Sequence, residues 1–167
     1  MNPRIKQTEI EDLLPFAILN DYMKIVRYFF DSLVKEKKFL VTNTLIYRLI
    51  CASFSKNSDV FNYLLEKIKS TSPDAFNNFE WKTDILGLAC SAGNVHASKT
   101  ITDLILEKKG SEIYFTDPFI SAILKGSIEI CQFFIDKKVD INFNQIVSRC
   151  SDFGFIKPEI FSLIINN

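Results

Sequence analysis

The residues with most capacity for chemistry are a single histidine, His96, and four cysteines at positions 51, 90, 131 and 150. Cys90 and His96 could form a thiol–imidazole pair, in which the imidazole takes the thiol proton and leaves a nucleophilic thiolate. The two residues lie six positions apart across an expected loop, and no third group that would orient the imidazole is apparent. A cysteine-dependent enzyme is therefore the least favoured of the functional alternatives.

Other catalytic and metal-binding patterns are not found in the sequence. Asp103 and Glu107 lie four residues apart on an expected helix and could share a metal ion, but paired acids on a solvated helix face are commonplace. There is no Gly-x-Ser-x-Gly motif, no phosphate-binding glycine loop and no zinc-ligand spacing. We expect no catalytic residues, no cofactor and no metal site.

The composition of the chain limits the kinds of partner it could bind and the cellular compartment in which we expect it. Twenty basic residues balance twenty acidic ones, which argues against an electrostatically driven nucleic-acid or membrane binder. The cysteines stand among apolar neighbours, so we expect them to be buried and reduced, as in a cytosol-like compartment. The start of the chain has no apolar signal core, and no run approaches the roughly 18 apolar residues of a membrane span. We expect a cytoplasmic protein.

Pairs of expected helices, which would position any functional site, recur along the chain. Helices are expected over 23–31, 58–66, 100–107, 128–136 and 158–166, and each ends in three bulky apolar residues followed by Asp, Glu or Asn. Before each of them a more compact helix is expected, over 13–21, 48–56, 84–93, 118–126 and 146–154. These first helices share a small central residue: Ala17, Ala52, Ala89, Ala122 and Cys150. Neither helix of a pair could bury its apolar surface alone, so the pairs need neighbours.

The fourth pair carries the most specific pattern. Asp117-Pro118-Phe119-Ile120 stands at its entry, Ala122 in its first helix, Gly126 between the helices and Val139-Asp140-Ile141-Asn142 at its exit, and Gly93 precedes Gly126 by 33 residues. This pattern resembles the ankyrin repeat. The resemblance implies an all-α fold, an α-solenoid of stacked antiparallel helix pairs, in one domain over 1–167 with approximate repeats 10–40, 41–79, 80–114, 115–143 and 144–167. The same pairs could also form another α-solenoid.

The resemblance also implies where a partner protein would bind, namely the concave side formed by the loop tips and the exposed face of the first helices. Two residues before the inter-helix glycine, where the family shows solvent, this chain has Leu19, Phe54, Ser91, Leu124 and Asp152. Three of the five are apolar, so they form either an apolar strip for a partner or side chains rotated into the core. The loop tips add Trp81, Lys82, Asp84, Tyr114, Thr116, Asn142 and Asn144. Trp81, the only tryptophan, is either an interface anchor or packs over its own repeat.

Three further features have two interpretations each. Lysines follow the second helix of each pair except the last pair. These lysines either complement the helix dipoles or form a basic ridge for an acidic partner. The long connection over 67–83 and the extra residues over 93–99 are either tolerated loops or a remodelled recognition edge. Phe161 and Ile165 of the last helix should be exposed, because no further unit follows them in the sequence to cover them.

The sequence thus predicts a non-catalytic protein–protein interaction module with an unidentified protein partner. The irregular repeats and the bias toward Phe, Ile, Asn and Lys are compatible with a virus- or pathogen-derived protein directed at a host factor. The alternative is a scaffold fragment of a longer ankyrin array, or one that self-associates through its C-terminal repeat.

Overall fold

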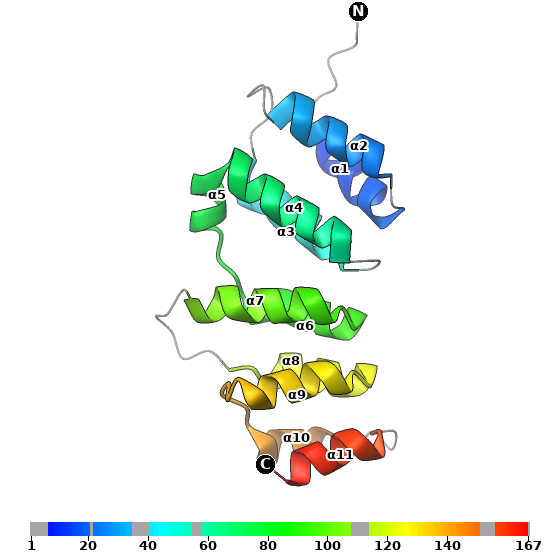
Figure 1. Ribbon diagram of the computed structural model, residues 1–167, viewed down its shortest axis with the longest axis vertical. Coiled ribbons are helices and arrows are strands. Elements are labelled where there is room, and N and C mark those ends of the chain that lie inside the picture. Colours follow the sequence, from blue (N-terminus) through cyan, green and yellow to red (C-terminus); the bar gives the residue numbers. More distant parts are fainter. Residues whose placement is uncertain are drawn as a thin grey trace, which may run out of the picture. The chain divides into compact units, whose positions relative to one another are not determined.

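The computed structural model describes residues 7–20, 22–34, 41–54, 58–107, 114–150 and 156–166, and every regular element within them is a helix (Figure 1). The all-α prediction is therefore confirmed. The chain divides into two compact units, Met1–Glu80 and Trp81–Asn167, and the boundary between them falls in the sequence where the third repeat was expected to begin. Of the helices described, none is both long and apolar enough to cross a membrane.

The described part of unit 1 forms the helical segments α1 (Gln7–Leu19), α2 (Met23–Tyr28), the π-helical segment η1 (Phe29–Val34), α3 (Asn43–Ser53), α4 (Ser58–Thr71) and α5 (Pro73–Asn78). The first helices α1 and α3 pack on one another, and each packs on the helix that follows it. Its core is apolar and rich in phenylalanine. The fully buried side chains include Leu14, Val26, Phe30, Leu45, Phe61, Leu64 and Ile68.

Unit 2 consists of three helix pairs: α6 (Thr83–Ala92) with α7 (Val95–Glu107), α8 (Thr116–Lys125) with α9 (Ile128–Asp136), and α10 (Phe143–Cys150) with α11 (Pro158–Ile165). The first helices α6, α8 and α10 pack in series, and so do the second helices α7, α9 and α11. The small residues Ala89 and Ala122 are fully buried, which agrees with the close approach expected of the first helices. A ladder of aromatic rings joins the last two pairs, because Phe119 contacts both Phe134 and Phe143.

Two glycines make the turns within the first two pairs of unit 2. Gly93 and Gly126 both have φ of +74°, a left-handed conformation that side chains other than glycine adopt at a cost. Gly126 donates its N–H to the carbonyl of Ile123, and Ser127 donates to that of Ala122, so carbonyls at the end of α8 are satisfied. A lysine from the following pair covers each glycine: Lys125 lies over Gly93 and Lys157 over Gly126.

The structure corrects the two segments that were expected to be long loops. Residues 95–99 are the start of α7, which is longer than α9 because it has an extra turn, and His96 is an exposed helix residue rather than a loop residue. Residues 67–71 extend α4, and residues 73–78 form α5, which begins at Pro73 after Ser72. The reason is visible in the apolar stripe, which continues forward to Ile68 in α4 and back to Ala97 in α7, both buried.

Candidate functional site

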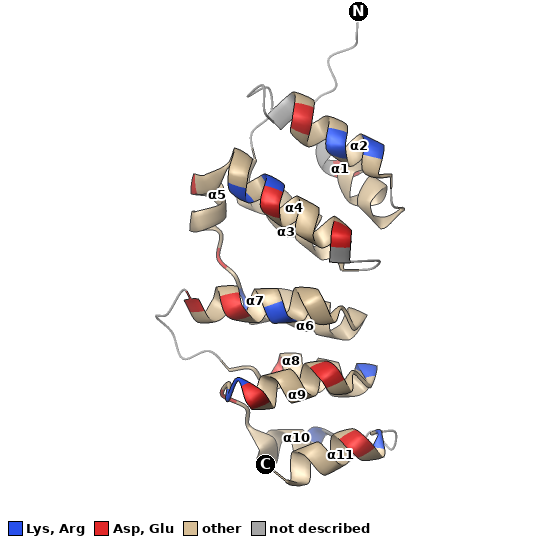
Figure 2. Cartoon of the chain, in the orientation of Figure 1, with Lys and Arg blue, Asp and Glu red and all other residues tan. Residues whose placement is uncertain are grey.

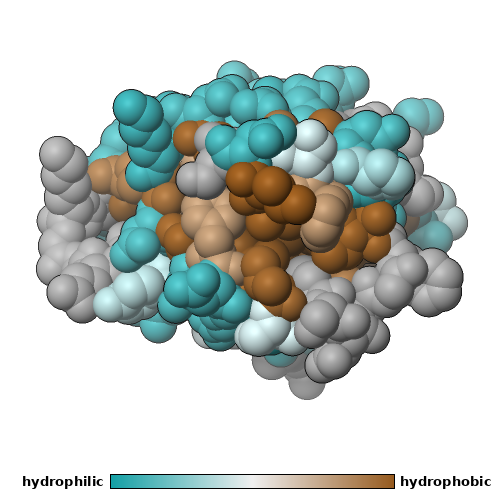
Figure 3. Space-filling model, turned by 90° about the horizontal axis from the view of Figure 1, so that it is seen from below, coloured by the Kyte–Doolittle hydropathy of each residue, from teal (hydrophilic) through white to brown (hydrophobic). Residues whose placement is uncertain are grey.

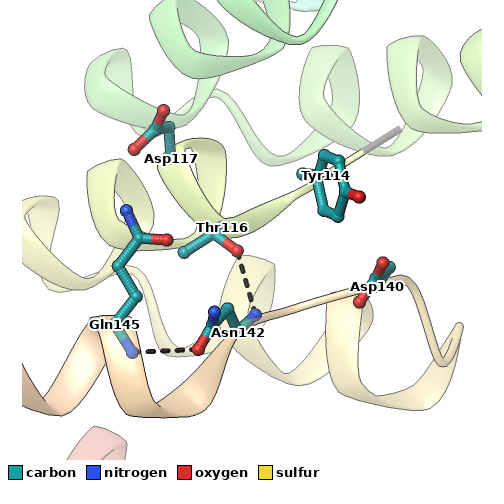
Figure 4. A pocket seen from close by; sticks show the side chains of 6 residues that line it. All are labelled: Tyr114, Thr116, Asp117, Asp140, Asn142 and Gln145. Carbon is teal, nitrogen blue, oxygen red and sulfur yellow. Dashed lines mark hydrogen bonds between the residues drawn. The ribbon is translucent and has the colours of Figure 1, made fainter. Parts of the chain in front are cut away.

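The site with the clearest geometry in unit 2 is a cleft of about 480 Å³ between the loops that precede α8 and α10. We call it the loop-tip cleft (Figure 4). The described residues that line it are polar or aromatic: Tyr114, Thr116, Asp117, Asp140, Asn142 and Gln145. Three of them, Tyr114, Thr116 and Asn142, were predicted from the sequence as partner-binding residues.

Main-chain and side-chain hydrogen bonds hold the two loops of the cleft together. The N–H of Phe115 donates to the carbonyl of Asp140 at 2.9 Å, and the N–H of Asn142 donates to the hydroxyl of Thr116 at 2.9 Å. Asn142 caps α10 by accepting the N–H of Gln145 at its side-chain oxygen. Because Phe115 and Thr116 are both buried, these bonds are shielded from water and the cleft is preformed.

The two carboxylates of the cleft differ in their surroundings. Asp117 accepts a hydrogen bond from the guanidinium of Arg149 on α10, and both side chains are largely exposed. Asp140 is exposed and its carboxylate has no ion pair or hydrogen bond within the described part of the chain. Tyr114 is 58% exposed. The cleft therefore offers an accessible ring and an accessible carboxylate.

The exposed face of the first helices adjoins the cleft. It carries Asp84, Leu88 and Ser91 on α6 and Asp117 and Leu124 on α8. Leu88 and Leu124 are 44% and 55% exposed, although the other large apolar residues of their helices are buried. These two helices lie close together, since a Cβ placed on Gly87 would be 3.9 Å from the hydroxyl of Ser121. We call this surface the first-helix face.

Most of the predicted partner-binding residues are exposed, but three are not. Leu19, Lys82, Asp84, Tyr114, Leu124, Asn142 and Asn144 are accessible to solvent. Phe54 and Trp81 are 4% and 6% exposed, so the interpretation of these two as exposed interface residues is wrong. Phe54 packs its ring on Phe61, and burial of the large indole ring of Trp81 removes much apolar surface from water. Thr116 is buried as well, with its hydroxyl bonded to Asn142, and Asp152 lies outside the described residues.

The last pair of unit 2 exposes apolar side chains on one face. Phe161 and Ile165 on α11 are more than half exposed, as expected, and Val147 on α10 is exposed to a similar degree. Figure 3, which views the molecule from the side of this pair, shows apolar side chains gathered there with polar side chains around them. We call the three residues the C-terminal patch.

Two of the lysines that follow the second helices are engaged in ion pairs. Lys67 donates to the carboxylate of Asp31 and Lys137 to that of Asp103, each at 2.7 Å, so each is paired with the second helix that precedes its own. Figure 2 shows acidic as well as basic residues on α4 and α7. The lysines at 35, 37, 38, 108 and 109 lie outside the described residues.

The burial of Cys90 argues against the thiol chemistry considered for this residue. Burial raises the pKa of the Cys90 thiol to about 12, and the thiol donates a hydrogen bond to Ser98 while His96 is exposed on the first turn of α7. Burial likewise raises the pKa of Cys131 to about 12. Both thiols are protonated at neutral pH, so neither supplies the thiolate that a nucleophilic mechanism requires. Among the described residues no cluster of three or more His, Cys, Asp or Glu could hold a metal ion.

Sequence reasoning did not propose Asp140, Gln145 or Leu88 as site residues. Asp140 belongs to the exit motif, but its position opposite Tyr114 depends on a contact between two loops that are distant in the sequence. Leu88 could have been found from its place in α6, since it falls on the helix face opposite the buried Ile85, Leu86 and Ala89. No family model, curated protein or solved structure matches the chain, so its function has to be inferred from its own chemistry.

Proposed function

We propose that the chain is a divergent ankyrin-repeat protein that binds a partner protein, without catalysis, through the loop-tip cleft and the first-helix face. The observation that carries this proposal is the exposure of Leu88 and Leu124 on neighbouring first helices, beside a preformed polar cleft. Aligned exposed apolar side chains with polar neighbours are typical of interaction sites. The turns at Gly93 and Gly126 and the serial packing of helix pairs support the ankyrin interpretation.

Binding would work by presenting a rigid surface. The helices α6 and α8 are held by a buried core, and the cleft by hydrogen bonds between its loops, so little ordering of this surface would be required on association. Leu88 and Leu124 would supply the apolar centre of the interface. The carboxylates and amides of the cleft would supply its polar edge and the specificity that polar groups give.

Affinity capture with paired variants tests the proposal. The double variant Leu88→Lys, Leu124→Lys should fold normally and lose the proteins that the original chain captures from a lysate, because two charges would be buried in the interface. The matched control Ile25→Lys makes the same change at an exposed apolar residue of α2 and should retain them. Identical capture by the original chain and the double variant would refute this surface as the binding site.

One observation favours a second candidate function, self-association through the C-terminal patch. The helix α11 is apolar on both sides, with Ile160 and Ile164 buried and Phe161 and Ile165 exposed. A helix that is apolar all round is usually covered. Light scattering over a concentration series would detect association of the original chain, which Ile165→Lys should abolish; a strict monomer would exclude it.

A further inference from the structure

The helix pair α1–α2 exposes apolar side chains on the face that later pairs turn toward the pair before them. Leu13, Ile25 and Tyr28 are 56%, 50% and 55% exposed, and we call them the N-terminal patch. Ile25 lies four residues before the middle of the apolar triplet that ends its second helix. The residues at that place in α4, α9 and α11 are at most 2% exposed: Val60, Ile130 and Ile160. Each of these three helices packs on the second helix that precedes it.

The other two residues of the N-terminal patch follow the same rule. Leu13 lies four residues before the small central residue of its helix, and the corresponding residue of α10, Ile146, is fully buried. Tyr28 corresponds to Phe133 on α9, whose ring centre lies 5.6 Å from the ammonium of Lys99 on the preceding second helix. All three positions therefore face a preceding pair wherever one packs against them.

The C-terminal patch occupies the opposite positions, which face the pair that follows. Val147 on α10 corresponds to Phe119 on α8, which is fully buried and packs its ring on Phe143 of the following pair. Phe161 lies three residues before the middle of its triplet. The residues at that place in α2, α4 and α9 are fully buried: Val26, Phe61 and Cys131. Among the described residues, the two patches are thus the two exposed halves of one recurring contact.

We propose that the N-terminal patch of one copy of the chain packs on the C-terminal patch of a second copy. This proposal rests on the self-association proposed above and names the surface that the C-terminal patch meets. The contact would repeat between two copies the packing that joins successive pairs within one copy, and it would remove both apolar patches from water. Because the two surfaces differ, the contact is head-to-tail, and each copy can take part in two such contacts.

The charges beside the two patches are complementary, which favours a second copy as the occupant. Lys24 on α2 and Glu159 on α11 are exposed, and the side chain of neither has a hydrogen bond or ion pair in the described part of the chain. The place of Lys24 is held in α9 by Glu129, which accepts a hydrogen bond from Lys99 on the preceding second helix. In α11 the place of Lys99 is held by Pro158, and Glu159 follows it. Stacked copies would therefore bring Lys24 close to Glu159, as the same kind of ion pair with its charges exchanged.

Sedimentation velocity of two blocked variants tests the head-to-tail contact. Ile25→Lys blocks the N-terminal patch and Ile165→Lys blocks the C-terminal patch, and each should weaken self-association at least about tenfold, because a charge would be buried without a partner. An equimolar mixture of the two should form a dimer and nothing larger, since the first variant keeps only its C-terminal patch and the second only its N-terminal patch. The matched control Ile128→Lys makes the same change on α9, outside both patches, and should associate like the original chain.

Exchange of the two charges is a second measurement that does not touch the apolar patches. Lys24→Glu and Glu159→Lys each alter an exposed side chain, so both variants should fold. Each alone should weaken association by about fivefold, because like charges would meet at an exposed contact. A mixture of the two variants should associate like the original chain, because opposite charges meet again.

The outcomes separate this contact from the functions proposed above. Association of Ile25→Lys equal to that of the original chain, no dimer in the mixture of blocked variants, or no recovery with exchanged charges would overturn the head-to-tail contact. Loss of association in Ile165→Lys alone would leave self-association through the C-terminal patch standing. A strictly monomeric original chain would overturn both. Capture of proteins through Leu88 and Leu124 is measured separately, and Ile25→Lys should retain it in every case.

Discussion

The two units connect successive second helices in the same way. In each, a basic residue and an aspartate four positions apart on one second helix meet a ring and a lysine four positions apart on the next. The quartets are Arg27, Asp31, Tyr63 and Lys67 in unit 1, and Lys99, Asp103, Phe133 and Lys137 in unit 2. A second recurrence joins the first helices, because Asp12 pairs with Arg48 in unit 1 as Asp117 pairs with Arg149 in unit 2.

The turns of the two units differ. All five glycines of the chain lie in unit 2 and unit 1 has none; of the glycines that the structure describes, Gly93 and Gly126 are at left-handed turns. Unit 1 instead ends α1 with Asn20, which donates from both its backbone and its side chain to the carbonyl of Phe16, and it contains the π-helical segment η1 and the additional helix α5. The side-chain quartet therefore tolerates irregular helices, whereas the glycine turns accompany the regular pairs that form the cleft.

The largest expected effect comes from the aromatic core of each unit. Phe134→Ala in unit 2 and Phe30→Ala in unit 1 both empty a fully buried site, and each should cost about 3–5 kcal/mol of the free energy of unfolding. Trp81 is the only tryptophan and belongs to unit 2, so its fluorescence follows that unit. In urea titrations Phe134→Ala should lower the midpoint of the Trp81 signal strongly.

Phe30→Ala should instead lower the helical circular dichroism at urea concentrations where the Trp81 signal is still native. Two separate transitions are expected because the rings that pack on Phe30, those of Phe29 and Tyr63, both belong to unit 1. A single transition, in which both signals move together in both variants, would show that the two units unfold as one body and would remove the basis for comparing them.

Alkaline pH should affect unit 2 more than unit 1, because Cys90 and Cys131 are buried there. Burial raises the pKa of both thiols from about 9 to about 12, so the folded state keeps protons that the unfolded state releases. Their contribution to stability is complete below about pH 9 and is lost as the pH rises toward 12. At pH 11 the loss should be roughly 2–3 kcal/mol per thiol, seen as a fall in the urea midpoint of the Trp81 signal.

The matched variant is Cys131→Ala, which removes one of the two thiols and should reduce the alkaline loss by about half. It also leaves a small cavity, which lowers stability at every pH and is therefore separable from the pH-dependent part. A urea midpoint of the original chain that stays constant between pH 8 and pH 11 would contradict the assignment of these thiols to the core.

Substitution at a glycine turn should lower the free energy of unfolding by about 1–2 kcal/mol. Gly126→Ala forces a side chain into a left-handed conformation, and its Cβ would lie 2.8 Å from Cε of Lys157, so unit 2 should lose that amount. Gly87→Ala is the matched control with the opposite sign. Gly87 lies inside α6 with a Cβ position 3.9 Å from Ser121, and alanine there should add roughly 0.5–1 kcal/mol. Equal effects of the two substitutions in urea unfolding would contradict this explanation.

The sequence predicted the helices well where turn residues mark them. The helix expected over 128–136 is α9 as observed, because Gly126 ends α8 and Ser127 begins the next helix. The expected helix over 58–66 ends before the observed end of α4, although the apolar stripe of α4 continues to Ile68. The expected helix over 100–107 begins after the observed start of α7, although the apolar stripe of α7 includes Ala97. Pro73 after Ser72 is a helix start that could have been recognised.

The rotation of individual side chains was less predictable. The positions of Phe54 and Leu124 relative to their helix ends were taken as equivalent in sequence, yet Phe54 packs on Phe61 while Leu124 is exposed. That difference depends on the tertiary packing around each helix, which local periodicity does not contain. The approach of Tyr114 to Asp140 was unpredictable for the same reason, since it requires the hydrogen bonds between two loops to be known first.

The smallest expected effect concerns the charge of the quartets. Lys137→Met keeps the aliphatic stem on the Phe133 ring and removes the ammonium, and since this lysine is partly exposed the cost should be about 0.5 kcal/mol or less. Lys67→Met should likewise destabilise unit 1. The hydrogen bond to Asp31 raises the pKa of Lys67, which means that the folded state favours its charged form. Urea unfolding at about 0.05 M and 1 M sodium chloride measures both effects, because salt screens an exposed ion pair.

A double-mutant cycle with Asp103→Asn then separates the pair from the ring. If the carboxylate and the ring both bind Lys137, the coupling free energy between Lys137 and Asp103 should fall at high salt. Part of the stability lost in Lys137→Met should persist at high salt, because methionine cannot replace a cation over a ring. The corresponding cycle of Lys67 with Asp31 in unit 1 should behave alike. Coupling in one unit and none in the other would mean that the recurrence is geometric only.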